Sequence, residues 1–276
     1  KGMVGSSLIR KFKELGYLNL VFASREELDL RDSTRVKKWF EINKPDITII
    51  AAAKVGGILA NDSYPYEFLL DNIKIQNNLI ENSFENNVKR LLFLGSSCIY
   101  PKFAHQPIKE EELLKSSLES TNESYAIAKI AGIKLCHALR NQYNFDAISL
   151  MPTNLYGPGD NYHPLNSHVL PALIRKFYNA KKNKDKVVSC WGTGNPLREF
   201  LYVDDLAEAC LFTLKNWDPS KNIKTLNKLD SMPSWLNIGS QYEISIRELA
   251  TKIATYIEYK GEIHWDNTKP DGTMRK

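Results

Sequence analysis

The sequence predicts an α/β protein built on a doubly wound parallel sheet, with a smaller substrate-binding lobe toward its C-terminus. Apolar segments of strand length alternate with segments of helical periodicity through residues 1–151. After Pro152 this alternation gives way to clusters of Pro, Gly, Asn and His. Strands that alternate with helices form parallel βαβ units. We therefore expect 1–151 with 201–238 to form a Rossmann-like sheet domain, and 152–200 with 239–276 to form the lobe.

The expected elements follow from the spacing of apolar residues along the chain. Helical spacing predicts helices over residues 3–15, 33–43, 61–86, 125–140, 169–180, 204–215 and 245–259, and Gly16 is placed to end the first. Short apolar runs predict strands over residues 18–23, 47–52, 91–94, 147–150, 200–203 and 236–238. The polar segment 218–234 is expected to be an exposed insertion or loop.

The two ends of the sequence interrupt this pattern. The chain opens with Lys1 and Gly2, within a strand-to-helix turn that has no strand before it, and stops at Lys276 without a clear terminal element. We expect the first strand of the sheet to be missing and the lobe to be truncated. A chain of this kind is expected to bind a dinucleotide weakly.

Composition excludes several classes of protein. The 276 residues carry a net charge of +5, but the basic residues are scattered, and the densest cluster, 181–186, includes an acid. A nucleic-acid patch is therefore not predicted. No apolar run approaches the roughly 18–20 residues that span a bilayer. Four cysteines without a C-x-x-C pair favour a reduced, cytoplasmic protein, and no histidine spacing predicts a metal.

Two short segments point to a dinucleotide. Gly2, Met3, Val4 and Gly5 open the first helix, where glycines allow close approach of a pyrophosphate and the helix N-terminus supplies free N–H donors. Arg25 follows the second expected strand, where enzymes that use NADP place an arginine against the 2′-phosphate and enzymes that use NAD place an acid. Arg25 favours NADP, although Glu26 comes directly after it.

The strongest chemical signal is the pair Tyr125 and Lys129. A spacing of four places both side chains on one face of a helix. An ammonium beside a phenol favours the phenolate, so we expect Lys129 to lower the pKa of Tyr125. Ser96 lies just past a buried strand, where its hydroxyl can bond a substrate oxygen. This set resembles the Ser–Tyr–Lys triad of the extended short-chain dehydrogenase/reductases.

Longer segments resemble one family of that group, the GDP-L-fucose synthases, over essentially the whole chain. These segments are residues 51–58 (AAAKVGGI), 93–101 (FLGSSCIYP), 124–136 (SYAIAKIAGIKLC), 151–161 (MPTNLYGPGDN), 166–177 (NSHVLPALIRKF), 191–205 (WGTGNPLREFLYVDD) and 269–273 (KPDGT). The resemblance implies NADP(H)-dependent conversion of GDP-4-keto-6-deoxy-D-mannose to GDP-L-fucose, by inversion at carbons 3 and 5 and reduction at carbon 4. It also implies a homodimer that binds a GDP-sugar and neither membrane nor nucleic acid.

The same resemblance assigns residues. Those implied to be catalytic are Ser96, Tyr125, Lys129, Cys98 and His168, with Cys98 and His168 moving protons during epimerisation. Those implied to hold the cofactor are Gly2, Met3, Val4, Gly5, Arg25, Leu94, Gly95, Ser96, Ser97, Lys129, Pro152, Thr153, Asn154, Leu155 and His168. Those implied to bind the GDP-sugar are Lys176, Trp191, Arg198 and Asp271.

The residues also allow structural interpretations. A cysteine after a strand is often a small buried hydrophobe, and His168 could simply pack under a loop. Trp191 could be part of a core, and Arg198 could pair with Glu199. A ketone acidifies the hydrogens on both neighbouring carbons, so two-sided proton transfer by a thiol and an imidazole suits the implied reaction.

Other functions remain open at this point. A sugar-nucleotide 4,6-dehydratase resembles its relatives in having an acidic pair where this chain has Ser97 and Cys98. A 4-epimerase retains NAD, which Arg25 disfavours. A non-catalytic dinucleotide-binding paralogue would not need the tyrosine and lysine that this chain keeps, and only the net charge favours a nucleic-acid-binding protein.

Overall fold

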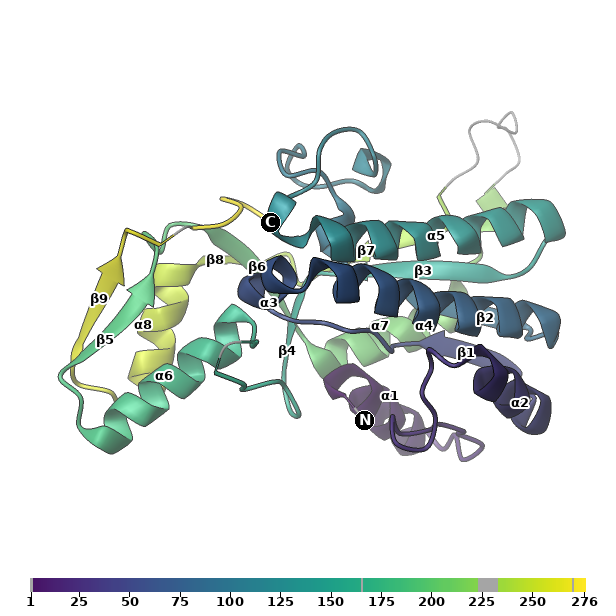
Figure 1. Ribbon diagram of the computed structural model, residues 1–276, viewed down its shortest axis with the longest axis horizontal. Helices are drawn as coiled ribbons and strands as arrows, with labels where there is room; N and C mark the ends of the chain where they lie inside the picture. The colour runs from purple at the N-terminus through teal and green to yellow at the C-terminus, as the bar shows by residue number, and fades with distance from the viewer. Residues whose placement is uncertain (1, 165, 223–232, 270) are drawn as a thin grey trace.

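A computed structural model describes residues 2–164, 166–222, 233–269 and 271–276. Figure 1 shows two bodies side by side, a sheet domain covered by helices and a smaller lobe that contains β5, β9, α6 and α8. The expected insertion at 218–234 lies largely outside the described residues.

The helices are α1 (Met3–Glu14), α2 (Ser33–Asn43), α3 (Ile58–Ser63), α4 (Pro65–Glu85), α5 (Glu123–Tyr143), α6 (Val169–Asn183), α7 (Val203–Asn216) and α8 (Ile246–Ile257), with short 3₁₀ turns at Ser97–Ile99, Glu110–Glu112, Ser120–Asn122 and Pro219–Asn222. The strands are β1 (Ile47–Ile50), β2 (Arg90–Leu94), β3 (Ala147–Pro152), β4 (Asn154–Tyr156), β5 (Val187–Trp191), β6 (Leu197–Tyr202), β7 (Trp235–Ile238), β8 (Glu243–Ser245) and β9 (Glu262–Asp266).

The main sheet is parallel, in the order β1-β2-β3-β7. Successive residues of β2 point to opposite sides of the sheet, and helices cover both sides, so both faces of the sheet are buried. Leu91 and Phe93 join one core with α2, α4 and α5, whereas Leu92 and Leu94 join the other with α1 and α7. Helices on both faces of a parallel sheet make a doubly wound fold, as the sequence predicts (Figure 1).

Helix α5 lies close against β2 because Gly132 has no side chain. A Cβ atom at Gly132 would lie 2.6 Å from the ring of Phe93, which is fully buried. This close approach sets the height of α5 above the sheet. It therefore places Tyr125 and Lys129, at the start of α5, above the C-terminal end of β2.

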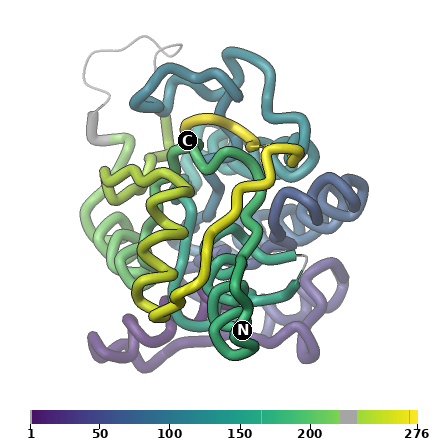
Figure 2. Tube along the Cα trace, turned by 90° about the vertical axis from the view of Figure 1, so that its left-hand side faces the viewer, coloured from purple at the N-terminus to yellow at the C-terminus, as the bar shows by residue number. Residues whose placement is uncertain are grey.

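The lobe has its own core. Strands β5 and β9 pair in parallel, and α6 and α8 pack on them through Phe177, Cys190 and Ala250 (Figure 2). A capping box begins α8, because the Ser245 hydroxyl accepts from the N–H of Glu248 while the Glu248 carboxylate accepts from the N–H of Ser245. Strands β4, β6 and β8 form a small sheet between the lobe and the main sheet.

Two expected elements are wrong. Residues 18–23 do not form a strand, and Leu18 is 84% exposed. A strand is stabilised by a neighbouring strand, and the main sheet ends at β1 without pairing this segment. The single helix expected over 61–86 is two helices, because Pro65 lacks the N–H that would continue α3 and instead occupies the first turn of α4.

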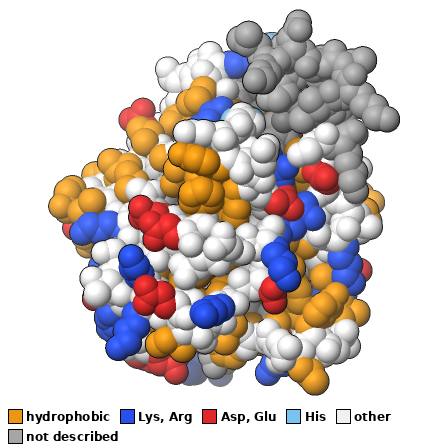
Figure 3. Space-filling model, turned by 90° about the vertical axis from the view of Figure 1, so that its right-hand side faces the viewer, with side chains coloured by type: hydrophobic (Ala, Val, Ile, Leu, Met, Phe, Trp, Pro, Cys, Tyr) orange, Lys and Arg blue, Asp and Glu red, His pale blue; other side chains and the backbone are white. Residues whose placement is uncertain are grey.

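The surface carries mixed charges. On the face shown in Figure 3, acidic and basic side chains lie among one another and around apolar groups. Of the helices in the described residues, none has the length and apolar character needed to cross a membrane.

Candidate active site

The first part of the site is the turn that follows β2. Ser96 begins a 3₁₀ turn over Ser97–Ile99, and its hydroxyl accepts from the backbone N–H of Cys98. The Cys98 thiol also donates to that hydroxyl, at 3.1 Å between Sγ and Oγ. The turn thus brings two residues of the predicted set into direct contact. Cys98 is 7% exposed, so the structure also allows the view of it as a small buried side chain.

Lys129 is the buried cation of the site. It is only 4% exposed, and its ammonium donates to the Leu94 carbonyl at 2.8 Å, at the end of β2. The Nζ atom lies 4.7 Å from the centre of the Phe93 ring and 5.9 Å from that of Tyr125. Burial lowers the pKa of this ammonium to about 8, against an opposing effect of Cys98.

The pKa of Tyr125 does not follow the sequence prediction. Burial raises it well above its ordinary value, Cys98 raises it further, and a hydrogen bond with Ser96 lowers it. Lys129 is not among the groups that shift it. The spacing of Tyr125 and Lys129 correctly places them on one helix face, but the ammonium turns to Leu94 and does not offset the burial of the phenol.

Replacing Lys129 with Met is expected to change how stability depends on pH. The folded state disfavours the charged ammonium, because its pKa is lowered from 10.5 to about 8. This cost is present in full below pH 8 and is lost as the pH rises toward 10.5. Urea unfolding should therefore show the parent gaining about 1–3 kcal/mol relative to Lys129→Met between pH 7 and pH 10. An unchanged difference would contradict the burial of a charged Lys129.

His168 stands at the N-cap position of α6. The loop before α3 holds the chain there, because the Gly57 N–H donates to the Asn166 carbonyl at 3.2 Å. The His168 side chain is exposed, and desolvation by the protein around it is the main effect that lowers the pKa of its imidazole. Asp160 opposes this effect and Lys276 adds to it. Neither Asp160 nor Lys276 is among the site residues predicted from the sequence.

Gly57→Ala is expected to move His168. A Cβ atom at Gly57 would lie 2.5 Å from the Ser167 carbonyl oxygen, and because both atoms belong to backbone segments, one segment has to shift. A displacement of about 1 Å at a reacting group lowers rates roughly 10- to 100-fold. Steady-state kinetics on the folded variant check this, and an unchanged kcat/KM would show that this contact does not position His168.

The residues predicted to bind the GDP-sugar lie in and beside the lobe. The Lys176 ammonium lies 5.9 Å from the centre of the Trp191 ring and donates to the Ser189 carbonyl at 2.9 Å. Asp271 accepts from the Thr193 N–H at 2.7 Å and from its hydroxyl at 2.8 Å. Burial lowers the pKa of Arg198, against the opposing charges of Asp271 and Glu119. Trp191 is 56% exposed, so it is not part of a core.

The predicted cofactor residues come from several separate segments of the chain. Gly2 is the N-cap of α1, whose first turn has no acidic residue, and a Cβ atom at Gly2 or Gly5 would meet nothing within 4 Å. Thr153, in the segment 152–155, has a buried hydroxyl without a hydrogen-bond partner. Open space before a helix N-terminus and free polar groups fit a dinucleotide phosphate. Arg25 is exposed in the turn at 25–27.

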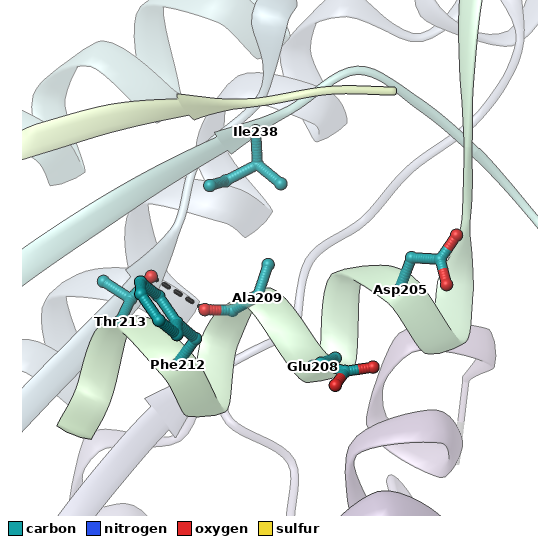
Figure 4. A pocket seen from close by; sticks show the side chains of 6 residues that line it. All are labelled: Asp205, Glu208, Ala209, Phe212, Thr213 and Ile238. Atoms are coloured by element: carbon teal, nitrogen blue, oxygen red, sulfur yellow. Dashed lines mark hydrogen bonds between the residues drawn. The ribbon is translucent and has the colours of Figure 1, made fainter. Parts of the chain in front are cut away.

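A hollow elsewhere does not belong to this set. It measures about 440 Å³ and lies along α7, where Ala209 and Thr213 face Ile238 of β7 (Figure 4). Asp205, Glu208 and Phe212 complete its lining. No residue predicted to bind cofactor or substrate lines it, so it is a feature of the surface rather than of the candidate site.

Comparisons with known proteins confirm the resemblance. The model of the NAD dependent epimerase/dehydratase family matches residues 1–227. The chain is 55% identical to GDP-L-fucose synthase 1 of Arabidopsis thaliana over 276 residues, which cover all of the chain and 81% of that protein. The chain is 49% identical to GDP-L-fucose synthase of Escherichia coli (strain K12), and this match covers all of the chain and 85% of that protein.

A solved structure agrees with the fold. GDP-mannoheptose C4 reductase from Campylobacter jejuni with NADP bound is 36% identical, with a TM-score of 0.89 over all of this chain and 86% of that one. The chain belongs to the NAD dependent epimerase/dehydratase family and, within it, to the GDP-L-fucose synthases.

Proposed function

We propose that this protein converts GDP-4-keto-6-deoxy-D-mannose to GDP-L-fucose with NADPH. The observation that carries the proposal is the contact of the Cys98 thiol with the Ser96 hydroxyl, beside Tyr125 and Lys129, in a chain 55% identical to a GDP-L-fucose synthase. The site thus combines an alcohol, a phenol, an ammonium and a thiol. Such a set suits both the removal of a proton beside a ketone and the reduction of that ketone.

NADP(H) is the cofactor that the residues fit best. The N-terminus of α1 would meet the pyrophosphate, Arg25 the 2′-phosphate, and Lys129 the ribose hydroxyls. The NADP bound to the related reductase supports this choice. When bound, NADPH supplies a hydride to carbon 4 of the sugar. The other predicted cofactor positions lie at the C-terminal ends of two strands, 94–97 after β2 and 152–155 after β3. Ligands of a doubly wound sheet usually bind at this end of the strands.

Ser96 and Tyr125 would hold the oxygen at carbon 4. Two hydroxyl donors on this oxygen stabilise the enolate that forms when a proton leaves carbon 3 or carbon 5. In the reduction, Tyr125 gives its proton to the same oxygen. The raised pKa of Tyr125 keeps the phenol protonated at neutral pH, which is the state in which it can donate.

Cys98 and His168 would transfer the protons of epimerisation. Cys98 adjoins Ser96 and therefore lies beside the oxygen site. His168 comes from the lobe side, at the start of α6, so the two groups can approach the sugar ring from different elements. Lys176, Trp191, Arg198 and Asp271 would hold the GDP part of the substrate. Lys176 and Arg198 carry the positive charge that a diphosphate requires.

Substrate-dependent oxidation of NADPH tests the proposal. The complete protein should consume NADPH with GDP-4-keto-6-deoxy-D-mannose, and the product should be GDP-L-fucose. A reductase without epimerase activity would give an unepimerised alcohol, which nuclear magnetic resonance distinguishes. No NADPH loss with this substrate, together with turnover of another nucleotide sugar, would overturn the proposal.

We also propose that the protein is a homodimer in a reducing compartment such as the cytoplasm. Helices α4 and α5 lie side by side on one face and carry exposed apolar side chains, including Tyr66, Ile127 and Tyr143. The four cysteines are free thiols. Sedimentation at twice the monomer mass would support the dimer, and a monomer at assay concentrations would contradict it.

A further inference from the structure

The loop at 51–57, between β1 and α3, touches two sides of the candidate active site. At Gly57, a Cβ atom would lie 2.5 Å from the Ser167 carbonyl oxygen and 3.9 Å from the backbone nitrogen of His168. At Gly56, a Cβ atom would lie 3.0 Å from the Phe68 ring. Adjacent peptide groups of one loop thus pack against the start of α6 and against a ring of α4. In Figure 1, α3, which follows this loop directly, lies where the sheet domain meets the lobe.

The Phe68 ring extends the contact of Gly56 to Tyr125. Phe68 lies in the first turn of α4 and is only 3% exposed. Its ring meets that of Tyr125 edge to face, with 6.4 Å between the centroids. Side chains in a close-packed interior cannot move independently of their neighbours. A displacement of the Gly56 backbone would therefore reach Tyr125 through a single buried ring.

One buried side chain holds both glycine peptide groups. Asn61 of α3 is 7% exposed, and its amide nitrogen donates to the Gly56 carbonyl at 2.8 Å and to the Gly57 carbonyl at 3.1 Å. A carbonyl oxygen can only accept, so the position requires a group with two N–H donors, which an amide has. The earlier part of the loop is held separately, because the Asn72 amide pairs with the N–H and the carbonyl of Lys54 at 2.8 and 3.0 Å.

We propose that Asn61 is a positioning residue that fixes His168 relative to Tyr125, by holding the two peptide groups that pack toward them. It touches neither the substrate nor the cofactor in this role. The catalytic meaning of the inference rests on the proposed function, in which Tyr125 holds the oxygen at carbon 4 while His168 transfers a proton at a neighbouring carbon. Both groups then have to meet the same sugar ring in a fixed geometry, and a displacement of about 1 Å at a reacting group lowers rates roughly 10- to 100-fold.

Hydrogen exchange tests the inference without any sugar substrate. Asn61→Leu keeps the size and branched shape of the side chain but removes both donors, and the backbone bond from residue 61 to the Gly57 carbonyl, at 3.1 Å, remains to begin α3. Exchange is read by mass spectrometry on the complete protein. It should become up to roughly 10-fold faster in residues 54–58 and 166–168, the usual effect of losing one hydrogen bond, and stay unchanged in β2 and β3. If Asn61→Leu fails to fold, Asn61→Ser, which is too short to reach Gly56, replaces it.

Asn82→Leu is the matched control. Asn82 is 5% exposed, and its amide nitrogen also donates to a backbone carbonyl, that of Asn78, at 2.7 Å. In the part of the chain that the structure describes, the buried amide oxygens of Asn61 and Asn82 both lack a hydrogen-bond partner. Asn82 lies toward the other end of α4 from Phe68. Exchange at 54–58 and 166–168, and turnover, should equal those of the parent.

Kinetics distinguish positioning from a purely structural role. In Asn61→Leu, kcat and deuterium uptake at carbons 3 and 5 should fall roughly 10- to 100-fold. The KM for the GDP-sugar and the Kd for NADPH should stay close to those of the parent, because only geometry in the transition state is lost. Rates are expressed per NADPH-binding site, so that unfolded protein does not lower them.

Three results would overturn the inference: unchanged exchange at 54–58 and 166–168, an equal change in Asn82→Leu, or faster exchange in Asn61→Leu without any fall in kcat. Failure of the proposed function looks different. In that case the parent turns over no GDP-sugar, while Asn61→Leu still speeds exchange in both segments, and the hold of Asn61 on the loop stands.

Discussion

Tyr125→Phe is expected to lower the rate of NADPH oxidation by about 10²–10⁴-fold, the usual contribution of a positioned general acid. The variant keeps the ring, including its edge-to-face contact with Phe68 at 6.4 Å between centroids, and loses only the hydroxyl. Deuterium uptake at carbons 3 and 5 should fall as well, because the enolate loses one of its two donors. Single-turnover kinetics measure both effects.

Tyr100→Phe is the control for this experiment. Tyr100 is a buried tyrosine at the end of the turn that Ser96 begins, and its hydroxyl donates to the Asn237 side chain at 2.5 Å. Removing that hydroxyl should change turnover only a few-fold through lost stability. Equal losses in the two variants would mean that Tyr125 acts by packing and not as an acid.

Cys98→Ser is expected to abolish deuterium incorporation at carbons 3 and 5, because a serine hydroxyl is far less acidic than a thiol and cannot act as the base. The loss should reach about 10²–10⁴-fold, as for removal of a general base. The substitution keeps a small side chain beside Ser96, so the turn after β2 should fold. Binding of NADPH, measured by fluorescence, should remain unchanged.

Cys210→Ser serves as the comparison. Cys210 is buried in the core between α7 and the sheet, away from the turn that contains Ser96. Exchange should continue in this variant at a rate close to that of the parent. Persisting exchange in Cys98→Ser would show that another group removes the proton.

The sequence was sufficient for features that depend on local pattern. The apolar run of β2 and the helical spacing of α5 predict a strand followed by a helix that presents Tyr125 and Lys129 on one face. The structure has both elements, and α2 at Ser33–Asn43 has the predicted bounds. The segment 18–23 has an equally apolar pattern but forms no strand, because strand formation also needs a partner.

Features that depend on contacts between distant segments could not be predicted in this way. Spacing indicates which helix face Tyr125 shares with Lys129, but not that burial dominates the pKa of the phenol. Nothing near Gly57 in the sequence indicates that it touches Ser167. The last residue, Lys276, is an ordinary lysine in the sequence, and only the pairing of its segment with β6 brings it to the hollow that Ser97 and Glu119 also line.

The most direct test of the account is to run the reaction in deuterated water with unlabelled NADPH and to locate deuterium in the product. If one site performs both stages, GDP-L-fucose should carry solvent deuterium at carbons 3 and 5 and ordinary hydrogen, delivered from the cofactor, at carbon 4. A reduced product without deuterium at carbons 3 and 5 would contradict it.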